Sequence, residues 1–226
     1  MSASTSFQRA RDPEQKEQRR QDLLAAARQL IAAGGLPAVG LSAIAREAGL
    51  AKSNVYRYFG SREEILLELL AEDADAWATA FEAAAAALTA SDDVARVAAI
   101  VAATVAAQPM TCELIAVVAG VLEHNTSATA AAAFKARMLA LSIRIHDVLV
   151  ATLPSLPPAR ATDVVRYLHA LIGGLWPMAR PNATMCAILA EPRYASLRCD
   201  FEADLRGCLR ALLSGLCHGG RATVAP

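Results

Sequence analysis

An all-α protein is the fold class that this sequence predicts, and three observations lead to it. Apolar residues recur at spacings of three and four along most of the chain, which is typical of amphipathic helices. Strand-like alternation of apolar and polar residues is nearly absent. Glycine, proline and capping residues divide the apolar repeats into segments of helical length. We therefore expect about nine to ten helices.

The N-terminal section predicts one amphipathic helix followed by two short helices. Asp12 can cap the first helix because Pro13 suits the first helical position, and Gly34-Gly35 ends this helix. Its apolar side consists of Leu23, Leu24, Ala27, Leu30 and Ile31. The short helices are expected over about Leu41 to Ala48, which Gly49 terminates, and over about Lys52 to Phe59.

A long helix and six further helices are expected after this section. Gly60-Ser61 stops the third helix and caps a fourth, which we expect from about Arg62 to Ala87. The remaining punctuation predicts helices over about Ser91–Ala107, Thr111–His124, Ala128–Leu153, Arg160–Ala179, Ala183–Ala190 and Tyr194–Leu216.

The composition is that of a globular protein. Of 226 residues, 55% are hydrophobic and 19% are charged, and apolar content this high hints at surface hidden by a partner subunit. Since no apolar run approaches the roughly 20 residues of a membrane span, we expect no transmembrane helix. The opening MSASTSFQRARD lacks the apolar core of a secretory signal. We therefore expect a cytoplasmic protein.

Cysteine and histidine positions do not indicate a metal or catalytic site. The five cysteines are an odd number, and Cys199, Cys208 and Cys217 lie nine residues apart, so neighbours point to opposite helix faces. We interpret them as small buried apolar residues. The four histidines show no HExxH spacing, and neither a phosphate loop nor a nucleophile elbow is present. The sequence therefore predicts no enzyme, no metal and no cofactor.

Charge is distributed unevenly along a chain of zero net charge. Residues 1–62 hold ten Lys or Arg and five Asp or Glu, a net charge of +5. Residues 63–75 hold six acids and no base, a net charge of −6. A basic N-terminal section is the electrostatic footprint of a polyanion partner.

The two short helices have the lengths and the glycine turn of a helix-turn-helix, over about residues 41–60. In that motif the second helix enters the DNA major groove. Val55 and Phe59 would form its inner side. Its outer side would carry Lys52, Ser53, Asn54, Arg57 and Tyr58, all of which form hydrogen bonds. On charge alone, an ordinary solvated polar face explains these residues equally well.

The stretch LSAIAREAGLAKSNVYRYFGSREEIL resembles the DNA-binding domain of the tetracycline-repressor (TetR) family of bacterial transcription regulators. The resemblance extends over residues 19–70 and implies roles for eight residues. Lys52, Ser53, Asn54 and Arg57 would meet bases or nearby backbone, Tyr56, Tyr58 and Arg62 would grip phosphates, and Ser42 would reach the groove. Many members have Ser or Thr where this chain has Val39, Gly40 and Ala51, which puts some caps and phosphate contacts in doubt.

The resemblance also implies a domain organisation and a function. Residues 1–14 would be a flexible arm, 15–70 the DNA-binding domain, 71–217 a helical regulatory and dimerisation domain, and 218–226 a disordered tail. The protein would be a sequence-specific regulator, most simply a repressor, binding an inverted-repeat operator in double-stranded DNA as a homodimer until a small-molecule effector releases it. A constitutive or architectural DNA binder without an effector is the alternative, and an all-α enzyme is a more distant one.

Two sites are expected in the C-terminal part. The first is a dimer interface on the helices 160–179 and 194–216, whose apolar residues at helical spacing include Val164, Leu168, Ile172, Phe201, Leu205, Leu209 and Leu213. Packing inside one subunit explains part of the same pattern. The second is an effector pocket with Trp77, Phe81, His124, Phe134, His169 and Trp176 as candidates, although ordinary core packing accounts for each of them. Because few charges fall in the central helices, we expect a largely apolar effector.

Overall fold

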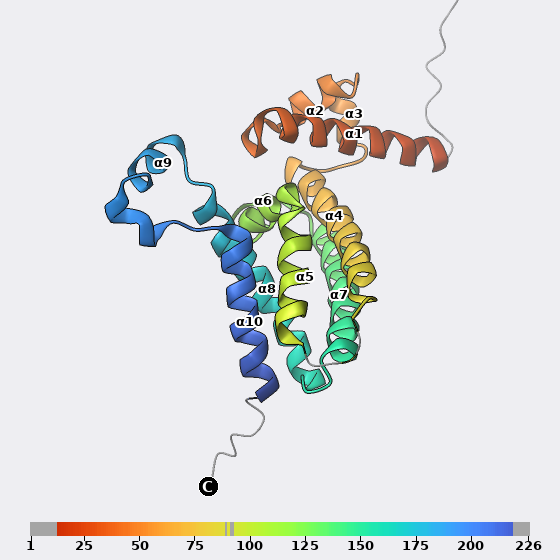
Figure 1. Cartoon of the computed structure of the whole chain (residues 1–226). Coiled ribbons are helices and arrows are strands. Elements are labelled where there is room, and N and C mark those ends of the chain that lie inside the picture. Colours follow the sequence, from red (N-terminus) through yellow and green to blue (C-terminus); the bar gives the residue numbers. More distant parts are fainter. Residues whose placement is uncertain (1–12, 89, 91–92, 219–226) are drawn as a thin grey trace, which may run out of the picture.

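The computed structural model describes residues 13–88, 90 and 93–218, and within these ranges the chain is built from helices and contains no strand (Figure 1). The α-helices are α1 (Pro13–Gly34), α2 (Leu41–Glu47), α3 (Lys52–Val55), α4 (Arg62–Ala85), α5 (Val94–Ala106), α6 (Pro109–Val117), α7 (Ala128–Thr152), α8 (Pro158–Ala179), α9 (Ala183–Leu189) and α10 (Phe201–His218). Shorter helical turns are η1 (Leu36–Ala38), η2 (Val118–Leu122) and η3 (Pro192–Leu197). The all-α prediction is confirmed.

The first three helices and the start of α4 form an N-terminal unit that lies across the top of the molecule (Figure 1). Leu23 and Leu24 of α1, Ile44 of α2 and Val55 of α3 are each at most 1% exposed and share one core. This core is completed by four side chains from helices outside the N-terminal unit, namely Leu114 of α6, Val118 and Leu122 of η2, and Phe134 of α7. The N-terminal unit therefore does not have a core of its own.

The remaining helices form a bundle below this unit, with a second core (Figure 1). In the bundle α4 packs on α5 and α7, α6 packs on α8, and α10 packs on α5 and α8. The buried stripe of α10, with Phe201, Leu205, Leu209 and Leu213, belongs to this core, as do Val164, Leu168 and Ile172 of α8. The side chains expected at a dimer interface are thus largely used for packing within one subunit.

The acidic run that follows the basic section lies on α4, where arginines from two other helices neutralise it. From α1, Arg20 pairs with Glu68 at 2.7 Å, and Arg28 pairs with Glu72 at 3.0 Å and also with Asp73. From α7, Arg137 pairs with Glu68 at 2.6 Å and with Asp75 at 3.1 Å. Glu68 therefore joins three helices.

Three helices differ from their predicted bounds. The helix expected to end at Phe59 ends at Val55, and tighter turns continue it through the N–H of Tyr58, which donates to the Val55 carbonyl at 2.9 Å. The helix expected over Thr111–His124 ends at Val117 and continues as η2, a π-helical turn of the kind often found at functional sites.

The helix expected over Tyr194–Leu216 is also wrong, because it is interrupted between η3 and α10. Asp200 restarts the helix: its carboxylate accepts the Ala203 N–H at 3.0 Å, and its own N–H donates to Asp204 at 2.9 Å. This reciprocal arrangement resembles a capping box, with the second aspartate one position later than in the standard motif. Asp93 caps α5 in the same way by accepting the Arg96 N–H at 3.0 Å.

Several sequence expectations lie outside the described residues. They include the Asp12 cap, the Ser91-Asp92 helix start, nearly all of the proposed N-terminal arm and all but His218 of the proposed tail. Among the described helices, none alone is long and apolar enough to cross a membrane. Only the pair Val94–Ala106 and Pro109–Leu122, taken together, passes the same criteria of length and composition, and the two parts are bent by 88°.

Both helices of the helix-turn-helix begin without a side-chain cap. The residue before α2 is Gly40 and the residue before α3 is Ala51, and neither has a side-chain oxygen that could accept an N–H of the first turn. Ala51 has the extended conformation of an N-cap residue, with φ −72° and ψ 142°. Its backbone is therefore already suited to a capping serine.

We expect Ala51→Ser to stabilise the folded chain by about 1 kcal/mol, because the serine oxygen would accept a free N–H of α3. Such a gain corresponds to a rise in melting temperature of about 2–4 °C. Thermal unfolding of the DNA-free protein is the measurement, and Ala51→Val, which adds side-chain atoms without an acceptor, is the control. If both variants melt together, the missing cap does not limit the stability of α3.

Candidate nucleic-acid interface and ligand cavity

A left-handed glycine makes the turn between α2 and α3. Gly49 has φ +67°, and its N–H donates to the Arg46 carbonyl at 3.2 Å, while Leu50 donates to Ala45 at 2.8 Å. These bonds satisfy carbonyls at the end of α2, and only glycine adopts this conformation without strain. The turn sets the angle between the two short helices.

The inner side of α3 holds it against the rest of the N-terminal unit. Val55 is fully buried and Phe59 is 4% exposed. The guanidinium of Arg20 lies 5.0 Å from the centre of the Phe59 ring, within the range of a cation–π contact. A helix of four residues cannot be stable alone, so these contacts fix its orientation.

The outer side of α3 presents polar groups that have no partners in the part of the chain that the structure describes. Lys52, Ser53 and Arg57 are exposed, and Tyr56 is 53% exposed. Ser42 is exposed on α2, and Asn54 is half-buried between the two sides. Hydrogen-bond donors and two cations thus project from this side of α3. Such a surface is suited to contact the phosphates and the base edges of a nucleic acid.

Tyr58 and Arg62, the other two predicted DNA contacts, are turned toward the domain. Tyr58 is half-buried and lines a cavity of about 150 Å³ between α1, α4 and α7. Arg62 donates a hydrogen bond to the Leu36 carbonyl at 2.7 Å, which ties the start of α4 to η1. The Nε atom of Arg62 is buried and has no partner within the described residues.

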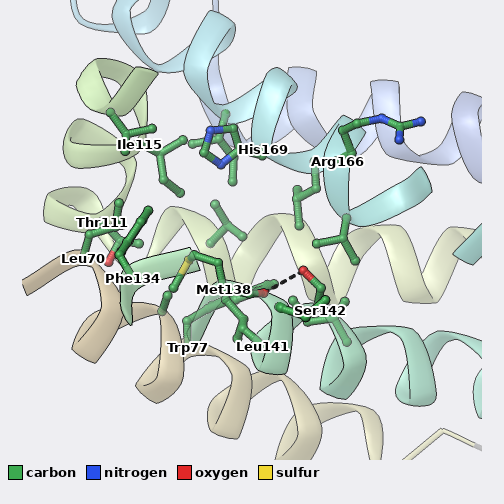
Figure 2. A pocket seen from close by; sticks show the side chains of 18 of the residues that line it. Leu70, Trp77, Thr111, Ile115, Phe134, Met138, Leu141, Ser142, Arg166 and His169 are labelled. Carbon is green, nitrogen blue, oxygen red and sulfur yellow. Dashed lines mark hydrogen bonds between the residues drawn. The ribbon is translucent and has the colours of Figure 1, made fainter. Parts of the chain in front are cut away.

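A larger cavity of about 480 Å³ lies inside the bundle, between α4, α6, α7 and α8 (Figure 2). Its buried wall consists of Leu70, Ala74, Trp77, Val105, Thr111, Cys112, Val118, Phe134, Leu141, Ile145, Leu168 and Ile172. Its exposed lining, which forms the mouth, consists of Ala119, Glu123, Lys135, Leu139, Thr162, Arg166 and His169. This volume lies within the range for drug-sized ligands.

Polar groups are few in the interior of this cavity and mostly satisfied. The Trp77 indole donates to Thr104 at 3.2 Å, and the Ser142 hydroxyl donates to the Met138 carbonyl at 2.8 Å (Figure 2). The Thr111 hydroxyl is the exception, because its oxygen is buried and has no partner among the described residues. The interior therefore suits an apolar ligand body.

Charged groups gather at the mouth. Lys135 pairs with Glu123 at 2.6 Å, and Arg166 pairs with Asp163 at 2.6 Å. The His169 ring reaches the cavity from α8 (Figure 2), where part of it is accessible to solvent. Burial and then the nearby Lys135 lower the pKa of His169, against a smaller opposing effect of Glu123. Both effects favour the neutral form of the ring.

Three of the six aromatic and histidine candidates line this cavity, namely Trp77, Phe134 and His169. Phe81 is stacked on Trp77 with ring centres 5.7 Å apart and lies outside the lining. Trp176 contacts Phe201 edge-on at 4.9 Å near the other end of α8, and His124 is exposed in the turn after η2. These three positions are apart from the cavity.

Sequence reasoning missed the aliphatic and small polar lining. Ile115, Met138 and Ile145 had no sequence signal that separates a cavity wall from ordinary core. Thr111 lies two residues after Pro109, in the first turn of α6, and its residue type gives no signal of a cavity. Cys112 also lines the wall, but burial raises the pKa of its thiol to about 12, so it is not a nucleophile at neutral pH.

The cavity wall and the core of the N-terminal unit share side chains. Leu70, Val118 and Phe134 line the cavity and also belong to the core that holds α1, α2 and α3. A ligand in contact with these residues would therefore touch the support of the helix-turn-helix directly.

Glu64 makes a second connection between the two units. Its carboxylate accepts hydrogen bonds from the Gly60 N–H at 2.7 Å and from the hydroxyl of Ser127, the N-cap of α7, at 2.6 Å. Partial burial raises the pKa of Glu64, but the bonds from Ser127 and Gly60 outweigh it, and the pKa lies below its ordinary value. The start of α4 and the start of α7 are thus held by one carboxylate.

No group of three or more His, Cys, Asp or Glu side chains in the described ranges is arranged to hold a metal ion.

Two parts of the chain match profiles of known families. Residues 23–69 match the family described as bacterial regulatory proteins, tetR family. Residues 71–219 match the family described as tetracyclin repressor-like, C-terminal domain. No curated protein sequence matches the chain.

Solved structures with the same arrangement of helices include three transcription regulators. The fatty acid degradation regulator FadR from Bacillus halodurans has a TM-score of 0.54 at 16% identity, covering 90% of this chain and 96% of its own. FadR from Bacillus subtilis, solved in complex with stearoyl-CoA, has a TM-score of 0.51 at 17% identity, with 88% and 98% covered. PfmR from Thermus thermophilus has a TM-score of 0.52 at 18% identity, with 86% and 98% covered. At these identities the likeness shows a shared fold.

We expect Thr111→Val to raise the melting temperature of the ligand-free protein by about 2–4 °C, because it removes a buried hydroxyl that has no partner. Thr152→Val is the matched control, since Thr152 is equally buried but its hydroxyl donates to the Val148 carbonyl at 2.8 Å. Thermal unfolding of both variants is the measurement. An equal rise in both would mean that the Thr111 hydroxyl is not an uncompensated polar group.

Proposed function

The chain belongs to the tetR family of bacterial regulatory proteins, and on this premise we propose that it is a dimeric repressor that a largely apolar effector releases from its operator. As a TetR-family regulator it carries a helix-turn-helix DNA-binding domain. Its chemistry is recognition and not catalysis. It acts in the cytoplasm, where the bacterial chromosome lies.

The outer side of α3 is the observation that carries the DNA-binding proposal. Lys52, Ser53, Tyr56 and Arg57 project from a helix that is held only by its inner side, and none has an ion pair or side-chain hydrogen bond among the described residues. In the proposed complex Lys52, Asn54 and Arg57 meet base edges, while Tyr56 holds a phosphate. Ser42 and Ser53 add contacts at the rim of the groove.

Tyr58 and Arg62 have supporting roles in this proposal. Arg62 holds η1 against the start of α4 through the Leu36 carbonyl, and its remaining N–H groups reach a phosphate from that position. Tyr58 borders the junction between α1, α4 and α7. Its position therefore responds to changes between the N-terminal unit and the bundle.

The cavity supports an effector-responsive regulator over a constitutive or architectural DNA binder. A protein that only coats or bends DNA has no use for a cavity of about 480 Å³ inside its second unit. The buried wall is almost entirely apolar, and the ionised side chains Glu123, Lys135 and Arg166 are at the mouth. We therefore assign an effector with an apolar body inside and a polar end near His169.

Release from DNA would follow because the cavity and the core of the N-terminal unit share side chains. The effector touches Phe134 and Val118, and these side chains also pack against the core beneath α2 and α3. A shift of η2 or of the first turn of α7 moves the Ser127–Glu64 contact and with it the start of α4. The distance between the two α3 helices of a dimer then no longer matches two successive major grooves.

The dimer itself is supported by the outward faces of the last helices. TetR-family regulators bind DNA as dimers. In α10, Ala203, Gly207, Ala211 and Gly215 recur every four residues opposite the buried leucines, and all are exposed. A side chain added at Gly207 or Gly215 would meet nothing within 4 Å, so packing within the subunit does not require glycine there. Close approach of a second helix would require glycine there, because glycine has no side chain to hold the two backbones apart.

We expect substitutions on α3 to separate base reading from phosphate binding. Asn54→Ala or Arg57→Ala should relax preference at one symmetric pair of operator positions, at a cost of about 1–3 kcal/mol for the cognate base. Tyr56→Phe should weaken binding to all DNA about equally. Affinities for the operator, selected from genomic fragments, and for its single-base variants at two salt concentrations are the measurement.

Equal losses on operator and random DNA for every α3 variant would remove the base-reading assignment. An operator without inverted-repeat symmetry would contradict the dimeric mode of binding.

We expect Phe134→Leu to uncouple effector binding from DNA release. A panel of fatty acids, phenols and ketones, screened by the rise in melting temperature, supplies a compound that binds the cavity. That compound should weaken operator binding of the wild type by about 1–3 kcal/mol and that of Phe134→Leu by about 0.5–2 kcal/mol less. Ile145→Leu is the control, because Ile145 lines the cavity but does not belong to the N-terminal core.

If Phe134→Leu and Ile145→Leu respond alike, the coupling does not pass through Phe134. A compound that stabilises the wild type without changing its operator affinity is not an effector.

A further inference from the structure

A projecting arm, here defined as Pro181–Cys199, connects α8 to α10 and contains α9 and η3 (Figure 1). None of its residues is buried, in contrast to every longer helix of the chain. Figure 1 shows it standing away from the bundle, so that one of its sides faces no other helix. Nothing in the subunit explains why the arm is present.

The arm is nonetheless held in a defined shape by its own polar groups. The Asn182 carboxamide accepts the Met185 N–H at 3.0 Å and caps α9. At the other end, the Arg198 guanidinium donates to the Leu189 carbonyl at 2.7 Å and to the Ala190 carbonyl at 2.9 Å. These bonds close the arm into a loop with fixed ends, in contrast to a linker that lacks internal contacts.

Its apolar side chains point outward from this framework. Met185 is 49% exposed, Ile188 is 40% exposed and Leu197 is 63% exposed. Fixing a backbone residue costs roughly 1–2 kcal/mol, and burial of apolar surface is what ordinarily offsets that cost. The isolated subunit supplies no such burial here. The arm therefore fits a surface that lies outside its own subunit.

Charge argues against nucleic acid or an anionic membrane as that surface. Arg193 is paired with Glu191 at 2.9 Å, and Arg198 is used on backbone carbonyls within the arm. No lysine occurs in the arm, so it offers a polyanion no unpaired cation. The partner surface must be largely apolar.

Position identifies the partner as a second copy of this chain. Both ends of the arm join helices whose outward faces form the proposed dimer interface, through Ala170 and Gly174 of α8 and the small-residue stripe of α10. An arm that leaves this interface extends beyond it over the other subunit. Two-fold symmetry then makes every arm contact twice.

We propose that the α9–η3 arm clasps a second copy of the chain and stabilises the dimer by burying Met185, Ile188 and Leu197 on it. This inference rests on the dimer of the proposed function. It adds to the helix-on-helix interface a contact that the α10 stripe alone does not provide.

The test compares dimer dissociation constants by analytical ultracentrifugation over a dilution series of the full chain. The double variant Ile188→Asp with Leu197→Asp should raise the dissociation constant at least hundredfold, because each of the two subunits loses two apolar side chains from the interface. Ile143→Asp is the matched control, since Ile143 is 54% exposed on α7 and lies away from the arm. Its dissociation constant should equal that of the wild type.

Folding does not confound this comparison. No arm side chain is buried in the subunit, so the double variant should retain the helical circular dichroism of the wild type. A wild-type dimer with an unchanged constant in the double variant overturns the arm clasp and leaves the proposed dimer standing. A wild-type protein that is monomeric at all concentrations overturns both.

Hydrogen exchange supplies a second measurement that a general loss of stability would not mimic. Gly207→Arg, which blocks the α10 face, gives a monomeric reference with an intact arm sequence. The amides of residues 184–190 should exchange at least tenfold more slowly in the wild-type dimer than in this monomer. Equal exchange rates in the two proteins would show that the arm does not touch the second copy.

Discussion

The helix-turn-helix of this protein depends on apolar contacts with helices that lie outside it. α2 has seven residues and α3 has four, and segments this short cannot bury enough surface to remain folded alone. They are held by α1 and α4, and the same core is completed by Leu114, Val118, Leu122 and Phe134 from the regulatory unit. The position of the DNA-reading surface is therefore set by the packing of α6, η2 and α7.

The large cavity of the bundle lies on the opposite side of the same packing layer. Phe134 and Val118 separate the cavity from the core beneath the short helices, and the π-helical turn η2 carries Val118. A well-packed interior transmits the displacement of one side chain to its neighbours. In the proposed regulator, a ligand in this cavity would have a short physical connection to the helix-turn-helix, without a separate signalling element. A polar connection exists as well, because the Glu64 carboxylate at the start of α4 accepts hydrogen bonds from the Gly60 N–H and from the hydroxyl of Ser127, the N-cap of α7.

The two sides of α10 differ in composition and burial. Its leucine stripe packs against α5 and α8 in the subunit core, whereas its small-residue stripe faces outward. Apolar periodicity alone could not separate an interface from the subunit core, because a helix buried on one side shows the same leucine repeat whether the neighbour is its own chain or a partner. The exposed small residues and the unburied arm between α8 and α10 are therefore the features on which the proposed dimer rests.

The sequence by itself determined the local features of this protein. Gly49 requires a left-handed turn, Ser61 caps α4 by accepting the Glu64 N–H, and the polar side of α3 opposite Val55 and Phe59 follows from residue order alone. Short-range geometry dictates each of these, so the helix-turn-helix and most of the helix bounds were predictable. Only the tertiary structure decided that Arg62 bonds to the Leu36 carbonyl, that Phe134 belongs to two units at once, and that His169 lines a cavity while His124 does not. These facts depend on which helices meet and at what angle, and a repeat of apolar residues states that a helix has a buried side without stating what covers it.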